Sequence, residues 1–221
     1  GSIRIPAGAC GVVGLKPTMG RVSRRGVMPL AWSFDTVGPM TRTAQDAALM
    51  LQVIAGYDSR DTGSVDTRVP DYAATMAAAT SSLRLGVPRG YFYEGLHPDI
   101  QVAMEAALSV LKTLGGAQLD LPPLATDATY SSVMTPYVAI LSAEAYAYHQ
   151  EYVARSPELY QAPTVERIRA GANVTTQTYI QSRRQLEQIR RSVARVFDGV
   201  DLLITPTARV PPFAIADLQS D

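Results

Sequence analysis

Apolar residues recur every three to four positions in three segments of the chain, which is the spacing of one face of an α-helix. These segments are residues 43–56, 98–114 and 175–197, and residues 136–154, rich in Ala and Tyr, are predicted as a fourth helix. In the first segment Ala47, Leu51 and Ile54 form the apolar stripe, and Thr43 precedes it as a candidate N-cap.

Short apolar segments between these helices are typical of β-strands. Residues 83–88 alternate with a period of two, and residues 117–122 fit a second strand. Residues 201–205 form a largely apolar run between Gly199 and Pro206, which predicts a buried strand. Because buried strands alternate with helices, we predict an α/β fold with a mixed, largely parallel β-sheet flanked by helices.

Two further segments have compositions typical of turns and surface segments, and the first of them is predicted to lack regular helix. Glycines at 8, 11, 14 and 20, with prolines at 6 and 17, indicate close backbone approach and tight turns, although residues 12–15 are a candidate strand. Residues 57–82 are rich in Asp, Ser, Thr and Ala, and we expect this segment to run over the protein surface.

The composition limits the class of protein. The chain has 221 residues, of which 47% are hydrophobic and 18% charged, so a substantial core is expected. Twenty basic and twenty acidic residues balance, which gives no electrostatic reason to expect nucleic acid or an anionic membrane as a partner. No apolar run is long enough to span a bilayer.

Metal and disulfide chemistry is also disfavoured. Cys10 is the single cysteine, and His97 and His149 lie far apart without ligand-like spacing, so neither a disulfide framework nor a zinc site is expected. We expect no cofactor. The start shows no signal-peptide pattern, which favours a cytoplasmic protein, and both ends look cut.

A family resemblance rests on the opening residues. Gly1-Ser2-Ile3-Arg4-Ile5-Pro6-Ala7, continued by residues 8–18, resembles the serine-bearing block of the amidase signature family. Later segments fit the same family in the same order: residues 20–26, 33–40, 46–48, 86–90, 144–149 and 201–207. The resemblance covers nearly the whole chain and implies that residues 1–221 are a partial amidase signature domain, truncated at the amino end and also at the carboxyl end.

The resemblance implies roles for particular residues. Ser2 matches the attacking serine, and the backbone N–H groups of Gly1 and Ser2 would line the oxyanion hole. In the family a neutral lysine takes a proton through a second, bridging serine, and both precede this block, so neither has a position among residues 1–221. Lys16 follows the nucleophile in a separate segment and is not expected to be the base.

A second reading of the opening residues is that Gly1-Ser2 is the remnant of a cleaved affinity tag. Ile3 to Ala7 follow in the register of the family motif, which favours a native serine. By the same resemblance, Arg183 and Arg184 lie in a region where some family members contact substrate. The alternative interpretation is that both arginines lie on a helix face exposed to solvent.

Other polar and aromatic residues have structural interpretations. We expect Arg4 to be buried and to have a structural role through its hydrogen bonds. Asp35 is expected to stabilise a turn by accepting hydrogen bonds from backbone N–H groups. Cys10 is predicted to be a small buried hydrophobe, and His149 to be packed or capping rather than catalytic. Core positions are expected for the aromatic residues, although Trp32 and Tyr137 are candidates to line a pocket.

Three functions follow from these observations. The first is an amidase that hydrolyses a small carboxylic amide to an acid plus ammonia or an amine through a serine acyl-enzyme. The second is the A subunit of a tRNA-dependent amidotransferase, which releases ammonia from glutamine. The third is a non-catalytic fragment, or a half that needs a complementary upstream chain. We expect residues 1–221 alone to be inactive, and poorly soluble or homo-oligomeric because sheet edges would be exposed.

Overall fold

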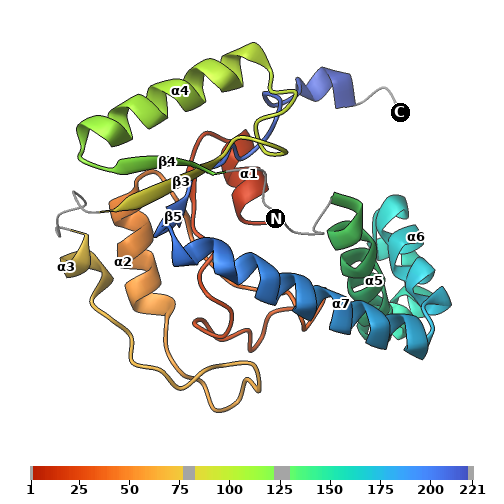
Figure 1. The fold of residues 1–221 in the computed structure, drawn as a ribbon. Coiled ribbons are helices and arrows are strands. Elements are labelled where there is room, and N and C mark those ends of the chain that lie inside the picture. Colours follow the sequence, from red (N-terminus) through yellow and green to blue (C-terminus); the bar gives the residue numbers. More distant parts are fainter. Residues whose placement is uncertain (1, 77–82, 122–129, 219–221) are drawn as a thin grey trace.

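The computed structural model describes residues 2–76, 83–121 and 130–218 (Figure 1). The α-helices are α1 (Arg4–Ala9), α2 (Ala44–Ile54), α3 (Tyr72–Thr75), α4 (Pro98–Thr113), α5 (Tyr130–Arg155), α6 (Ala162–Ala170) and α7 (Thr176–Ala194). The strands are β1 (Val13–Gly14), β2 (Met40–Thr41), β3 (Arg84–Pro88), β4 (Ala117–Leu121) and β5 (Leu202–Leu203). Mixed α/β architecture with a parallel sheet is as predicted.

The main sheet has three strands in the order β4-β3-β5, and both pairings are parallel. β3 is the central strand: Arg84 aligns with Ala117 of β4, and Leu85 aligns with Leu202 of β5. α4 connects β3 to β4 and lies along one face of the sheet (Figure 1). The remaining described strands, β1 and β2, form a separate antiparallel pair.

Burial differs from the prediction in two strands. β3 was expected to alternate, but Leu85 to Pro88 are all buried in this strand, which β4 and β5 flank at its two edges. The strand predicted at 201–205 is present as the shorter β5, but the prediction that it is buried is wrong. β5 pairs with β3 alone among the described strands, so one of its sides stays open, and Leu202 is 45% exposed.

The glycine-rich start contains a helix that the sequence did not predict. α1 covers Arg4–Ala9, so the expectation of turns without regular helix is wrong for these six residues. Close backbone approach is confirmed, because a Cβ on Gly14 would lie 2.6 Å from the Cβ of Ala7 and 2.9 Å from the carbonyl oxygen of Ile3. Gly14 therefore allows α1 to pack directly onto β1.

The predicted helix at 43–56 is confirmed. Thr43 is the N-cap of α2, and its hydroxyl accepts from the backbone N–H of Asp46 at 3.1 Å. Ala47 and Leu51 are buried and Ile54 is half-buried, as the apolar stripe predicted.

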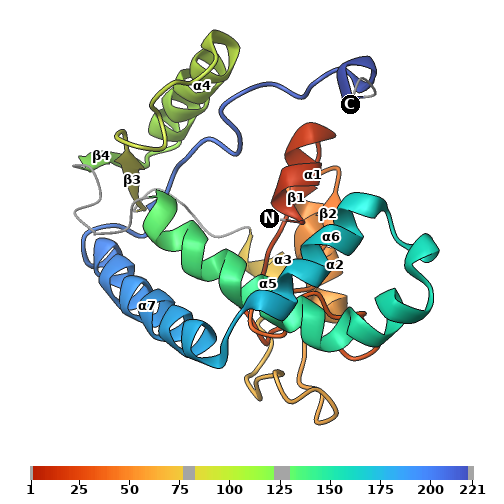
Figure 2. The same cartoon turned by 90° about the vertical axis from the view of Figure 1, so that its right-hand side faces the viewer.

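α5, α6 and α7 form a helical layer beside the sheet (Figure 2). α5 begins at Tyr130, before the predicted 136, and Pro136 lies buried inside the helix. α6 was not predicted; its Val165 and Ile168 pack on Ala145 and Val153 of α5. The surface segment predicted at 57–82 contains the short helix α3, and its residues 77–82 lie outside the described residues. Residue 122, the last of the strand predicted at 117–122, also lies outside them.

Candidate active site

Ser2 lies immediately before α1. It is exposed and precedes Ile3, the N-cap residue of this helix. The carbonyl of Ile3 accepts from the backbone N–H of Ala7 at 3.2 Å, and Ala7 is buried against β1. Ser2 therefore directly precedes a helix that packs on β1. Gly1, the second predicted oxyanion-hole residue, lies outside the described residues.

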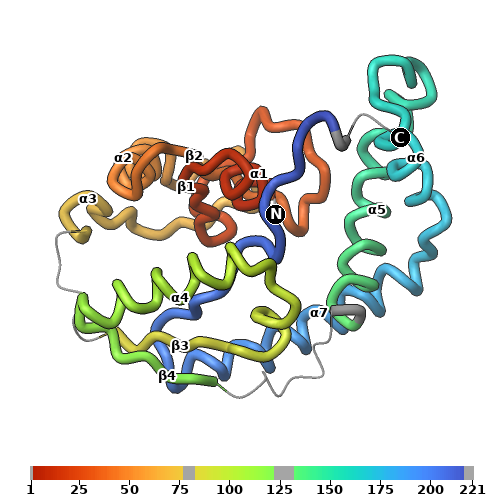
Figure 3. The backbone as a smooth tube through the Cα atoms, turned by 90° about the horizontal axis from the view of Figure 1, so that it is seen from above, coloured from red at the N-terminus to blue at the C-terminus, as the bar shows by residue number. Residues whose placement is uncertain are grey.

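A pocket of about 570 Å³ lies beside α1. Its walls are Arg4 and Ile5 of α1, Tyr91 and Phe92 after β3, and residues 203–209. The chain after β5 passes beside α1 (Figure 3), and a Cβ on Gly8 would lie 3.0 Å from Cγ2 of Thr207. Residues close to Ser2 in the sequence thus form one wall of a cavity that is also lined by residues 203–209, about two hundred positions further along the chain.

The pocket wall carries positive charge. Arg4 and Arg209 line it, whereas none of its described lining residues is Asp or Glu. The guanidinium of Arg209 lies 4.6 Å from the ring centroid of Tyr91 and donates to the carbonyl oxygen of Tyr91 at 2.6 Å. Two effects lower the pKa of Lys16: burial is the larger, and the positive charge of Arg4 is the smaller. The Nζ of Lys16 donates to the carbonyl of Pro17 at 2.6 Å.

A second polar cluster joins α5, α7 and the segment before β2. The buried carboxylate of Glu144 accepts from the backbone N–H of Ser33 at 2.8 Å and from its hydroxyl at 2.5 Å. The Tyr179 hydroxyl donates to Glu144 at 2.7 Å. Burial and then this bond raise the pKa of Tyr179. Sequence reasoning missed this cluster, and the signal that could have found it is an acidic residue within an Ala-rich helix.

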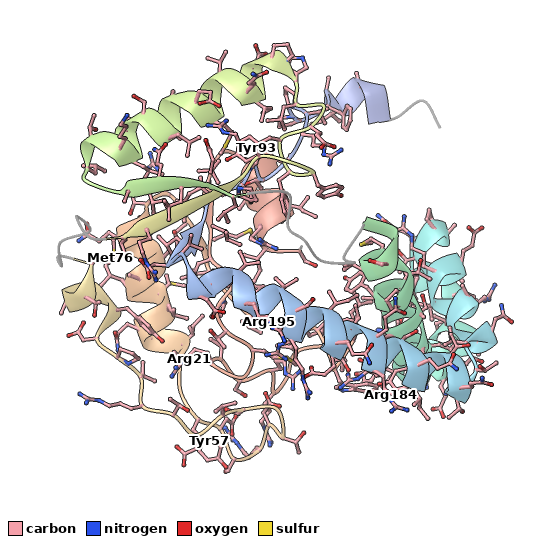
Figure 4. The ribbon with its side chains drawn as sticks, in the orientation of Figure 1. Arg21, Tyr57, Met76, Tyr93, Arg184 and Arg195 are labelled. Atoms are coloured by element: carbon pink, nitrogen blue, oxygen red, sulfur yellow. The ribbon has the colours of Figure 1, made fainter. Side chains whose placement is uncertain are left out.

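The structure separates the two predicted substrate-binding arginines. Arg183 donates to the hydroxyl of Ser33, and its Nη1 lies 4.0 Å from Oε1 of Glu144. Arg184 is exposed on α7 (Figure 4) and forms no ion pair with the described part of the chain. Neither arginine lines the pocket beside α1.

Two structural interpretations are wrong. Arg4 is exposed at the pocket instead of being a buried strut, because α1 is a surface helix that buries only Ala7. Cys10 is an exposed free thiol instead of a buried hydrophobe, because it lies at the carboxyl end of that helix.

Three other interpretations can be compared with the structure. Asp35 accepts from the backbone N–H groups of Leu30 at 2.8 Å and Ala31 at 3.0 Å, so its role in a turn is confirmed. His149 is buried, and its two ring nitrogens lie 3.0 Å from the Tyr160 hydroxyl and 2.8 Å from the carbonyl oxygen of Pro29, so its packed role is confirmed. Trp32 is half-exposed, at the edge of Tyr148.

The described residues hold neither a metal-ligand cluster nor a membrane-spanning helix. Across 2–76, 83–121 and 130–218, no group of three or more His, Cys, Asp or Glu side chains is placed to hold a metal ion. Within these ranges no helix combines the length and apolarity needed to cross a bilayer.

The fold is that of an α/β protein in which a serine precedes a short helix beside a pocket. The chain belongs to the Amidase family, whose model matches residues 1–221. An amidase of Pseudomonas putida is 41% identical over 96% of this chain and 45% of its own length. The A subunit of glutamyl-tRNA(Gln) amidotransferase from Trichlorobacter lovleyi is 39% identical, over all of this chain and 50% of its own.

A solved structure agrees with these relatives. The A subunit of glutamyl-tRNA(Gln) amidotransferase from Thermotoga maritima superposes with a TM-score of 0.76 at 31% identity, covering 100% of this chain and 47% of that one. This chain thus spans about half the length of the curated relatives it matches.

Proposed function

We propose that the whole protein hydrolyses a small carboxylic amide to an acid and ammonia or an amine, with Ser2 as nucleophile. The observation that carries the proposal is the match of residues 1–221 to the Amidase family, with an amidase 41% identical over 96% of the chain. The exposed position of Ser2 at the start of α1 supports it, since a nucleophile must be reachable by substrate.

The proposed chemistry has two stages. The Ser2 hydroxyl oxygen attacks the amide carbon and its proton passes to a base. The base then gives this proton to the amide nitrogen, the C–N bond breaks, and ammonia or the amine leaves, which gives an ester on Ser2. Water then attacks the ester, which releases the acid and restores the hydroxyl. Backbone N–H groups at Gly1 and Ser2 would stabilise the negative oxygen of each tetrahedral intermediate.

A serine hydroxyl needs a base to react at neutral pH. By the family resemblance, this base is a lysine that acts through a bridging serine, and both belong ahead of residue 1 in the whole protein. Lys16 is not assigned this role: its Nζ is bound to the carbonyl of Pro17. The proposed domain assignment follows, in which residues 1–221 contribute part of one amidase domain.

A related activity is the second candidate. Glutamine hydrolysis within an amidotransferase is favoured by the Trichlorobacter lovleyi relative, which is 39% identical over the whole chain. The two candidates share the serine chemistry and differ in the amide and in the need for partner subunits. We propose as partner either a complementary chain or a second copy of this chain. Sedimentation of the purified protein would detect self-association, or a complementary chain that stays bound during purification.

Ammonia release by the whole protein tests both candidates. We expect turnover of simple carboxylic amides, with Ser2→Ala abolishing turnover and Ser59→Ala, at an exposed serine, leaving it unchanged. An activated ester should add one acyl group to the wild type and none to Ser2→Ala, measured by intact mass. Full activity of Ser2→Ala would exclude Ser2 as nucleophile, and activity on glutamine alone would favour the amidotransferase.

The cellular location is a separate proposal. We propose that the protein is cytoplasmic, because its single cysteine is an exposed free thiol, which a reducing compartment preserves. Cell fractionation followed by immunoblotting should recover the protein with cytoplasmic markers, and recovery outside the cytoplasm would contradict this.

A further inference from the structure

We propose that the pocket between α1 and residues 203–209 binds a small organic carboxylate, with Arg4 and Arg209 holding the charged group. Ser2 is not among the residues that line this pocket, and the proposal does not depend on the reaction proposed at Ser2. The proposal rests on the shape of the pocket, the charges of its walls and the apolar surface between them.

The pocket has the size of a ligand site and its walls are held in place. Its volume of about 570 Å³ lies within the range of small-molecule pockets. The Tyr93 hydroxyl donates to the carbonyl of Ile204 at 2.9 Å, and the backbone N–H of His97 donates to the carbonyl of Arg209 at 2.9 Å (Figure 4). These two bonds fix both ends of the segment 204–209 against the turn that follows β3.

The charges in the pocket favour an anion. Within the part of the chain that the structure describes, neither Arg4 nor Arg209 forms an ion pair with a carboxylate, and no acidic side chain lines the pocket. A guanidinium has five N–H donors in a planar fork that matches a carboxylate. Arg209 donates to the carbonyl of Tyr91, which leaves further donors of the same guanidinium available for a ligand.

The rest of the wall favours an apolar body on this anion. Ile5, Phe92 and Leu203 contribute aliphatic and aromatic surface between the two arginines. The rings of Tyr91 and Phe92 meet edge to face with centroids 5.3 Å apart, which gives the wall a rigid aromatic corner. A bare inorganic ion would leave this surface exposed to water, whereas a carboxylate on a flat apolar group would cover it.

Calorimetric titration of the whole protein with benzoate tests the proposal, with benzyl alcohol as a neutral probe of similar shape and inorganic phosphate as an anion without an apolar body. We expect saturable benzoate binding, and weaker binding of both other probes. Arg4→Gln and Arg209→Gln should each weaken benzoate binding about tenfold, as expected for the loss of one charge-assisted hydrogen bond. Arg195→Gln is the matched control on a distant exposed arginine and should bind as the wild type does.

A second measurement covers the case in which an arginine variant does not fold. In the unmodified protein, benzoate should shift the side-chain N–H resonances of Arg4 and Arg209 and leave that of Arg195 in place. The proposal is overturned if benzoate does not bind saturably, if benzyl alcohol or phosphate binds as tightly, or if folded Arg4→Gln and Arg209→Gln variants retain wild-type affinity. Loss of Ser2 reactivity alone would leave benzoate binding intact, so the two proposals fail separately.

Discussion

Ser33 and Glu144 are joined by two hydrogen bonds to one carboxylate, although 111 residues separate them in the sequence. Ser33 donates both its backbone N–H and its hydroxyl, at 2.8 and 2.5 Å. Because Glu144 lies on α5 and Tyr179, its third donor, on α7, this carboxylate connects the helical layer to the loop before β2.

Glu144→Gln should destabilise the fold. An amide keeps the shape of the side chain but cannot accept all three bonds, and leaving one buried donor unsatisfied costs about 1–3 kcal/mol. Chemical denaturation of the variant measures this loss in the free energy of unfolding. Glu151→Gln, at an exposed position on the same helix, should lie within about 0.5 kcal/mol of the wild type. Equal stabilities of the two variants would contradict a role for Glu144 in joining the layers.

Tyr179 should titrate later than an ordinary tyrosine. Burial and the bond to Glu144 raise its pKa in the folded protein, whereas the unfolded phenol has a pKa of about 10. The folded state therefore keeps a proton that the unfolded state releases, so the stabilisation is complete below the unfolded pKa and is lost as pH rises through the folded pKa. The phenolate absorbance of wild type minus Tyr179→Phe should show this late step, and a step at the ordinary pKa would contradict it.

The sequence predicted the parts of the fold whose burial is local. The apolar stripe and the Thr43 cap of α2 depend on residues within one helix, so periodicity found them. Burial of β3 and exposure of β5 depend on strand order, which local pattern does not contain. The predicted start of α5 was too late: the helix begins at Tyr130 and continues through Pro136, a residue that usually disfavours a helix interior.

The residues of the candidate site likewise fall into two groups: those that the sequence could identify and those that only the tertiary structure brings together. Ser2 and its block were found from the order of residues in a motif, and this needed no tertiary information. Arg209, the carbonyl of Tyr91 and the contact of Gly8 with Thr207 come together only when the end of the chain returns to α1. Arg4 was assigned a buried role for the same reason, since the sequence does not show that α1 faces a cavity.

Gly14→Ala should disturb the position of Ser2. The added methyl would lie 2.6 Å from the Cβ of Ala7 and 2.9 Å from the carbonyl oxygen of Ile3, so α1 must move away from β1. Such overpacking costs about 1–3 kcal/mol. We expect a lower thermal midpoint and, in the whole protein, slower acylation of Ser2. Gly199→Ala, where an added methyl meets nothing within 4 Å, is the control and should change neither quantity.

Acid should weaken the junction between β3 and β5. Arg84 donates through its guanidinium and its backbone N–H to Asp201, and these bonds lower the pKa of Asp201 to about 2. The stabilisation from this ion pair is fully present above the pKa of the unfolded carboxyl, about 3.9. It is lost as the pH falls through the folded pKa of about 2. Asp201→Asn should therefore be less stable than wild type at neutral pH, with the difference shrinking below about pH 4.

Asp66→Asn gives the reference for this acid effect, because Asp66 is exposed and outside the described ion pairs. Its unfolding free energy should follow that of the wild type at every pH. A constant gap between Asp201→Asn and wild type from neutral pH down to about pH 2 would contradict the role of the ionised carboxylate.

Arg183 and Arg184 should respond differently to the same substitution. Arg183→Gln removes a donor to Ser33 and a cation 4.0 Å from Glu144, so we expect lower stability, by about 1 kcal/mol because the guanidinium is half-exposed. Arg184→Gln should leave the free energy of unfolding unchanged, because this side chain projects from α7 without an ion pair in the described residues. Any increase in KM on Arg184→Gln would then report contact with substrate and not a loosened fold, whereas unchanged KM would assign Arg184 to a solvated helix face.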